Sequence, residues 1–275
     1  MTQNENTKRA KKAALEHGAD LVGIVSVLDL PEHSERIERL LPDARSVLVL
    51  AAAHSLASLR SGANELAQFD TIHAYNESAR AAHAAARLLE NHGHLSAGVP
   101  AFIPLDMEEP GKGMRGEICW RRAGVRAGLG SYGESGALVT EEYGQAIRLA
   151  GVVTTAELTP DAPSKEDVCD HCMRCVEACP VNALSGGGKI NKKLCGDRIF
   201  KHGFRYFQKT MQGLLAEPTD ELREIMEGSG LRQLWQTFMA GNYYYCFRCQ
   251  CQCLASRLPV SPERAKRVEG SARLP

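Results

Sequence analysis

The stretch CDHCMRCVEACP, residues 169–180, places four cysteines within eleven residues and ends on a proline. Its spacing, C-x2-C-x2-C-x3-C-P, is the run in which bacterial ferredoxins hold two iron–sulfur clusters, the fourth cysteine binding the other cluster. Thiolates three residues apart can converge on one cuboidal cluster from a loop that wraps around it. Zinc is the alternative, because C-x2-C pairs also form tetrahedral zinc sites. Three evenly spaced cysteines followed by C-P favour iron–sulfur.

Further cysteines supply the ligands that two clusters of this kind still need. Cys246, Cys249 and Cys253 form a C-x2-C-x3-C run, and Cys195 stands alone ahead of it. Ferredoxin logic assigns one cluster to Cys169, Cys172, Cys175 and Cys253, and the other to Cys179, Cys195, Cys246 and Cys249. Cys251 is an alternative to Cys253, although the C-x3-C step favours Cys253. Cys119 is expected to be a small buried apolar residue.

The overall composition points to a cytoplasmic protein. The formal net charge is zero, so we expect no nucleic-acid partner, which would require a concentrated basic stripe. No apolar run approaches the roughly 20 residues of a membrane helix, and the polar N-terminus carries no export signal. In a reducing cytosol, clustered cysteines bind metal or do redox work more often than they form disulfides.

Apolar runs and helical patterns alternate ahead of the cysteines. We expect helices at 7–18, 31–44, 76–93 (capped by Asn76) and 117–128, and strands at 20–27, 46–53, 99–105, 135–140 and 146–155. This alternation predicts an α/β layer domain over residues 1–160. The stretch 158–167 has the composition of a linker. A second domain over residues 161–275 would then carry the cysteines, with a helical insert at 197–240.

The segment GLGSYG, residues 128–133, has the form G-x-G-x-x-G. A dinucleotide fingerprint must follow a strand and open a helix, whereas here a helix comes before it and a strand after it. We therefore expect Gly128, Gly130 and Gly133 to let the backbone turn tightly and approach a bulky flat ligand. SGGGK, residues 185–189, lacks the spacing of a P-loop.

Residues 40–51 and 121–158 resemble the epoxyqueuosine reductases and reductive dehalogenases, and the order and spacing of the cysteines match that family. The resemblance implies an α+β fold, in which a nitroreductase-like domain with a mixed sheet precedes a two-cluster ferredoxin-like domain. It also implies a corrinoid (cobalamin) held between the two domains, with Gly128, Gly130 and Gly133 in the corrinoid-binding loop. The clusters would deliver single electrons to its cobalt.

Several positions depart from the family pattern. The tRNA-modifying members carry an aspartate, their proposed proton donor, at the position that Met114 occupies here, and neither Asp106 nor Glu117 inherits that role. Glu134 stands where those members carry lysine. We also expect no helical-repeat extension and no export signal. These departures argue against both queuosine-type tRNA and respiratory organohalides as substrates.

Reductive chemistry needs a proton donor, and tyrosine suits this role because it is protonated at neutral pH. Tyr75 and Tyr132 are the candidates, with a half-buried structural aromatic as the alternative for each. We therefore expect a cytoplasmic reductase that takes electrons from a low-potential donor. Two 4Fe-4S clusters would pass them to a corrinoid that reduces a small-molecule substrate. The alternatives are an electron-transfer protein that reduces the cobalt of a partner corrinoid protein, and a flavin-binding iron–sulfur protein.

Overall fold

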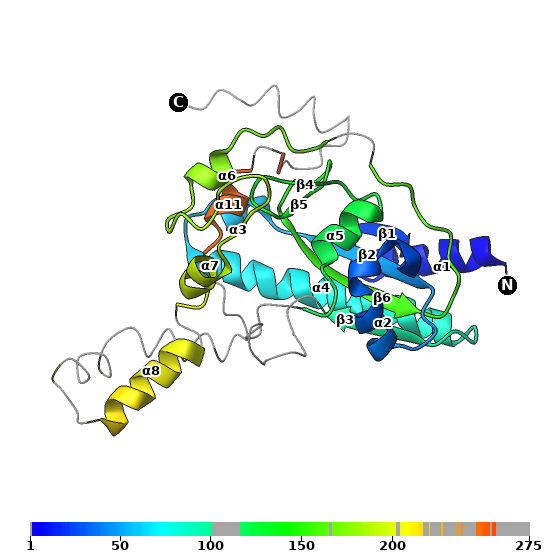
Figure 1. Cartoon of the computed structure of the whole chain (residues 1–275), viewed down its shortest axis with the longest axis horizontal. Coiled ribbons are helices and arrows are strands. Elements are labelled where there is room, and N and C mark those ends of the chain that lie inside the picture. Colours follow the sequence, from blue (N-terminus) through cyan, green and yellow to red (C-terminus); the bar gives the residue numbers. More distant parts are fainter. Residues whose placement is uncertain are drawn as a thin grey trace.

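The computed structural model describes residues 2–100, 116–164, 167–201, 204–216, 246–253 and 255–256, with the single residues 220, 227, 235 and 238. Within these residues, helices cover both faces of a four-stranded sheet. Figure 1 shows the short helices that carry the cysteines at one end of this sheet. No helix in the described part of the chain is long and apolar enough to cross a membrane.

The sheet has the strand order β1-β2-β6-β3, and each neighbouring pair is antiparallel. Its strands are β1 (Leu21–Ser26), β2 (Ser46–Ala53), β6 (Ile147–Thr154) and β3 (Ser96–Pro100). The prediction of a mixed sheet is therefore wrong for the described strands. The direction of a strand cannot be predicted from an apolar run, because the same side chains are buried whichever way the strand runs. The α+β class and the strands at 20–27 and 46–53 are confirmed.

The central strand β2 contributes alternate side chains to two separate cores, as the pleat of a strand requires. Val47, Val49 and Ala51 point into the first core, whereas Leu48 and Leu50 point into the second. All five are fully buried. Covering both faces in this way fixes the register of β2, because a slip by one residue would exchange the two sets.

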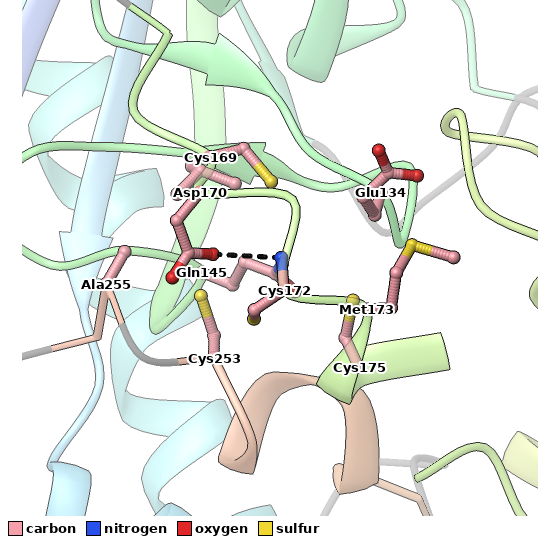
Figure 2. Close-up of a pocket in the computed structure, with 10 residues that line it drawn as sticks. Glu134, Gln145, Cys169, Asp170, Cys172, Met173, Cys175, Cys253 and Ala255 are labelled. Atoms are coloured by element: carbon pink, nitrogen blue, oxygen red, sulfur yellow. Dashed lines mark hydrogen bonds between the residues drawn. The ribbon is translucent and has the colours of Figure 1, made fainter. Parts of the chain in front are cut away.

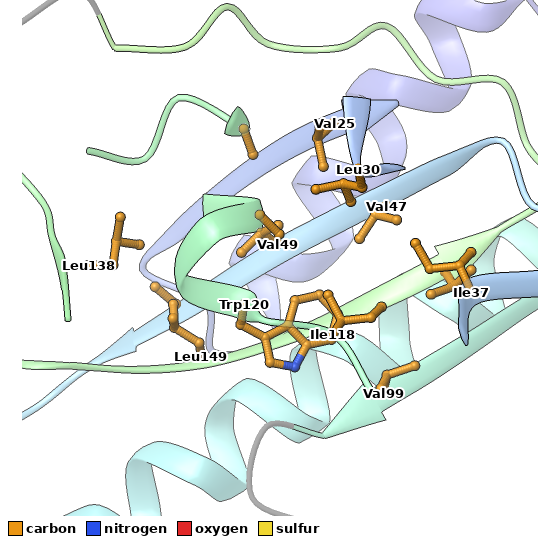
Figure 3. Close-up of a cluster of buried hydrophobic side chains, with 14 of the residues drawn as sticks. Val25, Leu30, Ile37, Val47, Val49, Val99, Ile118, Trp120, Leu138 and Leu149 are labelled. Carbon is orange, nitrogen blue, oxygen red and sulfur yellow. The ribbon is translucent and has the colours of Figure 1, made fainter. Parts of the chain in front are cut away.

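The first core lies beneath α2 (Ser34–Leu40) and α5 (Trp120–Arg126). Figure 3 shows the Trp120 ring at its centre, against the sheet. The ring sits where Gly151 of β6 has no side chain, and a Cβ added at Gly151 would collide with it. The helix predicted at 117–128 is thus present, although it begins at Trp120.

The second core lies beneath α1 (Gln3–Glu16) and α4 (Asn64–Glu90). Both helices present rows of buried alanines to each other and to the sheet, and such small side chains let helix axes approach closely: Ala10, Ala14, Ala81, Ala82 and Ala85. The predicted start of the second helix at Asn76 is wrong. Asn76 lies in the middle of α4, where its polar side chain does not interrupt the backbone ladder.

The stretch predicted as a linker is held against the sheet domain over part of its length. Leu158 is fully buried in the second core. The Asp161 carboxylate accepts a hydrogen bond from the backbone N–H of Ile24 (2.8 Å) and pairs with the Lys11 ammonium (2.6 Å). Residues 158–161 are therefore part of the packed sheet domain, although their composition is typical of a linker. The domain boundary near residue 160 stays a prediction.

The remaining described elements are short helices and two small strands. The hairpin β4 (Ser131–Tyr132) and β5 (Leu138–Val139) follows α5. The others are α3 (Leu56–Arg60), α6 (Arg174–Glu177), α7 (Lys192–Ile199), α8 (Phe204–Leu215) and α11 (Arg248–Cys251). α8 falls in the predicted helical insert, most of whose remaining residues lie outside the described ones, whereas α7 begins before the insert and overlaps only its start. α11 packs against both α6 and α3, which brings the second cysteine run to the first.

Candidate functional site

The loop that carries Cys169, Cys172 and Cys175 turns sharply around an open centre. His171 and Met173 both adopt the left-handed backbone conformation, with φ of 54° and 59°. Side chains other than glycine rarely take this conformation, which costs of order 1–3 kcal/mol at each position. The two left-handed residues let the loop turn sharply between Cys169 and Cys175.

One set of four thiols lines a single cavity at this centre. Cys169, Cys172 and Cys175 come from the first run and Cys253 from the second. Figure 2 shows their sulfur atoms around a common space. The space between these side chains and their neighbours amounts to about 300 Å³, part of it open to solvent.

The thiols of this first set lie close enough to repel each other when ionised. Burial raises the pKa of the Cys175 thiol, and the neighbouring charges of Cys169, Cys253 and Cys172 raise it further. Bound metal cations would remove this penalty, because a coordinating thiol is deprotonated outright. Among the described residues, no three His, Cys, Asp or Glu side chains surround a position for a single metal ion.

The second set comprises Cys179, Cys195, Cys246 and Cys249. Burial raises the pKa of Cys249 to about 12, and the nearby charges of Cys246 and Cys195 contribute to this shift. The pKa of Cys195 is raised by burial and then by the charges of Cys246 and Cys179. The charge of Cys175 also acts on Cys249, so the two sets are neighbours.

The two sets are interlaced in a symmetric way. Both runs contain C-x2-C-x3-C, and a four-residue helix begins one residue before the middle cysteine of each, α6 before Cys175 and α11 before Cys249. In each run the last thiol, Cys179 or Cys253, belongs to the set of the other run, and the thiols before it stay together in one set. Neither set is complete without both runs.

The two remaining cysteines lie outside these sets. The Cys251 thiol donates a hydrogen bond to the backbone carbonyl of Leu59 on α3 (2.7 Å) and packs on an apolar cluster that includes Phe247. Cys253, not Cys251, lines the first cavity. Cys119 is half-buried at the start of α5, where its backbone N–H donates to His33.

The three glycines of GLGSYG are packed closely against other parts of the chain. Gly128 (φ +75°) and Gly130 (φ +150°) need conformations that other residues rarely adopt. An added Cβ at these positions would strike the backbone carbonyl of Ala162 and that of Val139, respectively. At Gly133 it would approach the Val139 side chain to 2.6 Å. Internal packing alone therefore accounts for these glycines, and contact with a flat ligand stays a prediction.

Glu134 joins the glycine hairpin to the first cysteine loop. Its carboxylate is hydrogen-bonded to His171 (2.6 Å) and accepts from the backbone N–H of Gly187. The other ring nitrogen of His171 lies 3.0 Å from Asp167, and the two carboxylates together raise the pKa of His171. The family departure at Glu134 thus has a structural role beside the thiols. The Tyr132 ring packs nearby, against Gly188.

A buried polar group beside the second cysteine run was not predicted from the sequence. It contains Arg148 of β6, His54 after β2, and Asp70 and Thr71 of α4. Tyr75, the other proton-donor candidate, belongs to this group, because the Arg148 guanidinium lies 5.5 Å from the centre of its ring. No sequence signal marks the group, since its members are scattered along the chain and meet only through the sheet and α4.

Comparison with known proteins finds a family match in the cysteine region and relatives of known function. Residues 164–185 match the family described as "4Fe-4S binding domain". The epoxyqueuosine reductase of Listeria monocytogenes is 40% identical over 80 residues, which cover 29% of this chain and 21% of that protein. The tetrachloroethene reductive dehalogenase of Dehalobacter restrictus is 28% identical over 144 residues, or 51% of this chain and 24% of that protein. The chain thus matches about a quarter or less of each relative's length.

A solved structure extends the similarity to the whole fold. A reductive dehalogenase, whose structure is described as suggesting a mechanism for B12-dependent dehalogenation, superposes with a TM-score of 0.57 at 17% identity. The match covers 99% of this chain and 43% of that one. The resemblance inferred from the sequence is confirmed, and the structural match extends it along the chain.

Proposed function

Because the chain is related to the epoxyqueuosine reductases and the reductive dehalogenases, we propose that it is an iron–sulfur reductase with two 4Fe-4S clusters. It accepts electrons one at a time from a low-potential donor and passes them through the clusters to a corrinoid, where a small molecule is reduced. The observation that carries this proposal is the interlaced arrangement of two sets of four thiols. All eight donors are sulfur, the donor set that 4Fe-4S clusters use.

The proposed ligands follow from which thiols lie together. The first cluster is held by Cys169, Cys172, Cys175 and Cys253, and the second by Cys179, Cys195, Cys246 and Cys249. α11 packs against α6, so Cys249 and Cys175 lie on neighbouring helices, which supports a short path for electrons between the two clusters.

Residues of the sheet domain complete the first site. Val139 and Gln145, from the hairpin and the turn before β6, line the cavity beside the thiols. Gln145 is itself held by a hydrogen bond from Ser135 (2.9 Å). Glu134 fixes the His171 side of the cysteine loop. These contacts join the two parts of the chain around the first cluster, limit the access of water to it, and so contribute to its reduction potential.

A corrinoid, when bound, supplies a cobalt centre that accepts single electrons and reduces an organic substrate. Its support here is the sequence similarity to a reductive dehalogenase, together with the fold shared with a reductive dehalogenase whose structure is described as suggesting a mechanism for B12-dependent dehalogenation. Internal packing already fills the side of Gly130 where a Cβ would lie, so that residue is explained without a corrinoid contact. The proton donor stays a prediction, with Tyr75 and Tyr132 as its candidates.

Internal packing explains the glycine loop without a bound ligand, and a second candidate function needs no corrinoid there. In this alternative the chain keeps both clusters but holds no corrinoid, and it reduces the cobalt of a partner protein. Its substrate would then be a corrinoid protein rather than a small molecule.

One experiment tests the proposal in two stages. Protein reconstituted anaerobically with iron and sulfide should hold about eight iron atoms per chain, as two 4Fe-4S clusters require. Titration of this protein with cobalamin should then shift the cobalamin spectrum to the base-off form and saturate near one corrinoid per chain. Eight iron atoms without a spectral shift would favour the electron-transfer function. One zinc ion per thiol set, with no iron–sulfur absorption after reconstitution, would overturn both.

A further inference from the structure

Arg148 places a positive charge inside the protein, close to the second cysteine run. It is the second residue of β6, and only 8% of its surface is exposed. Its guanidinium donates to the side-chain oxygen of Gln250 (3.2 Å) and to the Thr71 hydroxyl (3.4 Å). Arginine keeps its charge at any pH that proteins tolerate, so this charge is permanent.

The contacts of Arg148 reach the residue that follows each thiol of the proposed ligand pair Cys246 and Cys249. Phe247 directly follows Cys246 in the sequence, and its ring centre lies 6.0 Å from the guanidinium. Gln250 directly follows Cys249. Arg148 therefore contacts the residue next to each of these two thiols.

Other contacts hold this arrangement in place. Gln250 donates through its amide nitrogen to the backbone carbonyl of Gln145 (3.1 Å), so its oxygen is turned towards Arg148. The centre of the Tyr75 ring lies 5.5 Å from the guanidinium, so the rings of Tyr75 and Phe247 both lie close to this charge. Such rings stabilise a cation in a site with little water.

The neighbouring histidine adds no second positive charge at neutral pH. His54 is hydrogen-bonded to the Asp70 carboxylate, and its side chain is fully buried. Burial and the charge of Arg148 lower the pKa of His54 to about 4. Arg148 is thus the positively charged member of this group across the physiological range.

We propose that Arg148 sets the reduction potential of the cluster held by Cys246 and Cys249, by stabilising its reduced form. Reduction adds one electron, and hence one negative charge, to the cluster. A fixed cation nearby makes this addition more favourable, particularly where little water screens the interaction. The inference rests on the proposed function, because it requires a cluster at this thiol set.

The test compares three variants of the reconstituted holoprotein by anaerobic redox titration, followed by electron paramagnetic resonance. Arg148→Gln removes the charge and keeps hydrogen-bonding groups, whereas Arg148→Lys keeps the charge. Arg126→Gln is the control, since Arg126 pairs with Glu32 at the surface. Loss of a signal in Cys195→Ala identifies the second cluster.

In Arg148→Gln we expect the second cluster to be reduced at a more negative potential, with its reduction equilibrium weakened at least tenfold, or about 59 mV for one electron. The potential of the first cluster should not change in Arg148→Gln. In Arg148→Lys and Arg126→Gln, the potentials of both clusters should stay near the wild-type values. An unchanged potential in Arg148→Gln, with both clusters present, would overturn the inference and leave the proposed function intact. Absence of clusters from the wild-type protein would instead overturn the proposed function.

A second variant keeps the test decisive if Arg148→Gln fails to fold. Gln250→Glu is nearly isosteric and places a carboxylate against Arg148, which offsets the positive charge without removing the side chain. The second cluster should again become harder to reduce. A wild-type potential in Gln250→Glu would count against the role of Arg148.

Discussion

The ligand assignment predicts opposite outcomes for two cysteines that stand two residues apart. Cys253 lines the cavity of the first thiol set, whereas the Cys251 thiol is hydrogen-bonded to the Leu59 carbonyl. Cys253→Ala should therefore remove one of four cluster ligands, and Cys251→Ala should remove none. The two substitutions are chemically identical and lie in the same short segment, so each serves as the control for the other.

The size of each effect can be worked out from these contacts. Cys253→Ala should cost the first cluster, which is about four of about eight iron atoms per chain. Cys251→Ala loses one hydrogen bond from a weak donor and leaves a buried carbonyl with one partner fewer, which costs about 1 kcal/mol. For a chain of this size, that loss lowers the melting temperature by about 2–4 °C.

The assay is iron and sulfide content after anaerobic reconstitution, with a melting curve recorded on the same samples. We expect Cys251→Ala to keep its full iron content with a slightly lower melting temperature, and Cys253→Ala to lose about half of its iron. Loss of iron in Cys251→Ala with retention in Cys253→Ala would refute the assignment, and with it the proposed exchange of thiols between the two runs.

Three further predictions concern the frame around the site. Gly130→Ala should lower the free energy of unfolding by at least about 3 kcal/mol in denaturant titrations, because the new methyl strikes the Val139 carbonyl. Gly187→Ala, whose Cβ would meet nothing within 4 Å, should cost only about 1 kcal/mol for its left-handed conformation; equal losses would contradict this account. His54 has a folded pKa of about 4 against an ordinary value of 6.5, so below pH 6.5 the unfolded chain binds a proton that the folded chain does not. The folded state should therefore lose about 1.4 kcal/mol between pH 7.5 and 5.5, and His54→Gln should abolish most of this loss, as measured by urea titration at each pH. Trp120→Ala should cost about 3–5 kcal/mol by leaving the space above Gly151 empty, and calorimetry showing a loss below 1 kcal/mol would contradict the packing described for the first core.

The sequence predicts the local elements well where burial alone defines them. The run 46–53 was expected as a buried strand, and β2 spans those residues because both faces of the strand are covered by apolar cores. It did not predict the antiparallel order of the sheet, which depends on how distant segments meet. The start of α4 was also missed, since Asn76 resembles a cap but lies within a helix that begins at Asn64.

The site divides in the same way. Cysteine spacing is local, so the run at Cys169 identified a cluster loop without any structure. The polar group around Arg148 could not be predicted, because a single arginine in an apolar strand resembles a surface residue until its partners are known. Likewise, the glycines at 128–133 suggested a ligand loop, whereas the structure shows that tight packing against Ala162 and Val139 is sufficient to require them.

The exchange of Cys179 and Cys253 between the two thiol sets has a consequence for how the protein matures. With the proposed ligands, each cluster would cross-link two chain segments that are far apart in sequence and so close the long loop between residues 179 and 246. The cluster that forms first bears most of the entropic cost of closing that loop. The other cluster then forms at thiols that are already close together. Assembly should therefore be cooperative, and oxidative destruction of one cluster should loosen the hold on its neighbour.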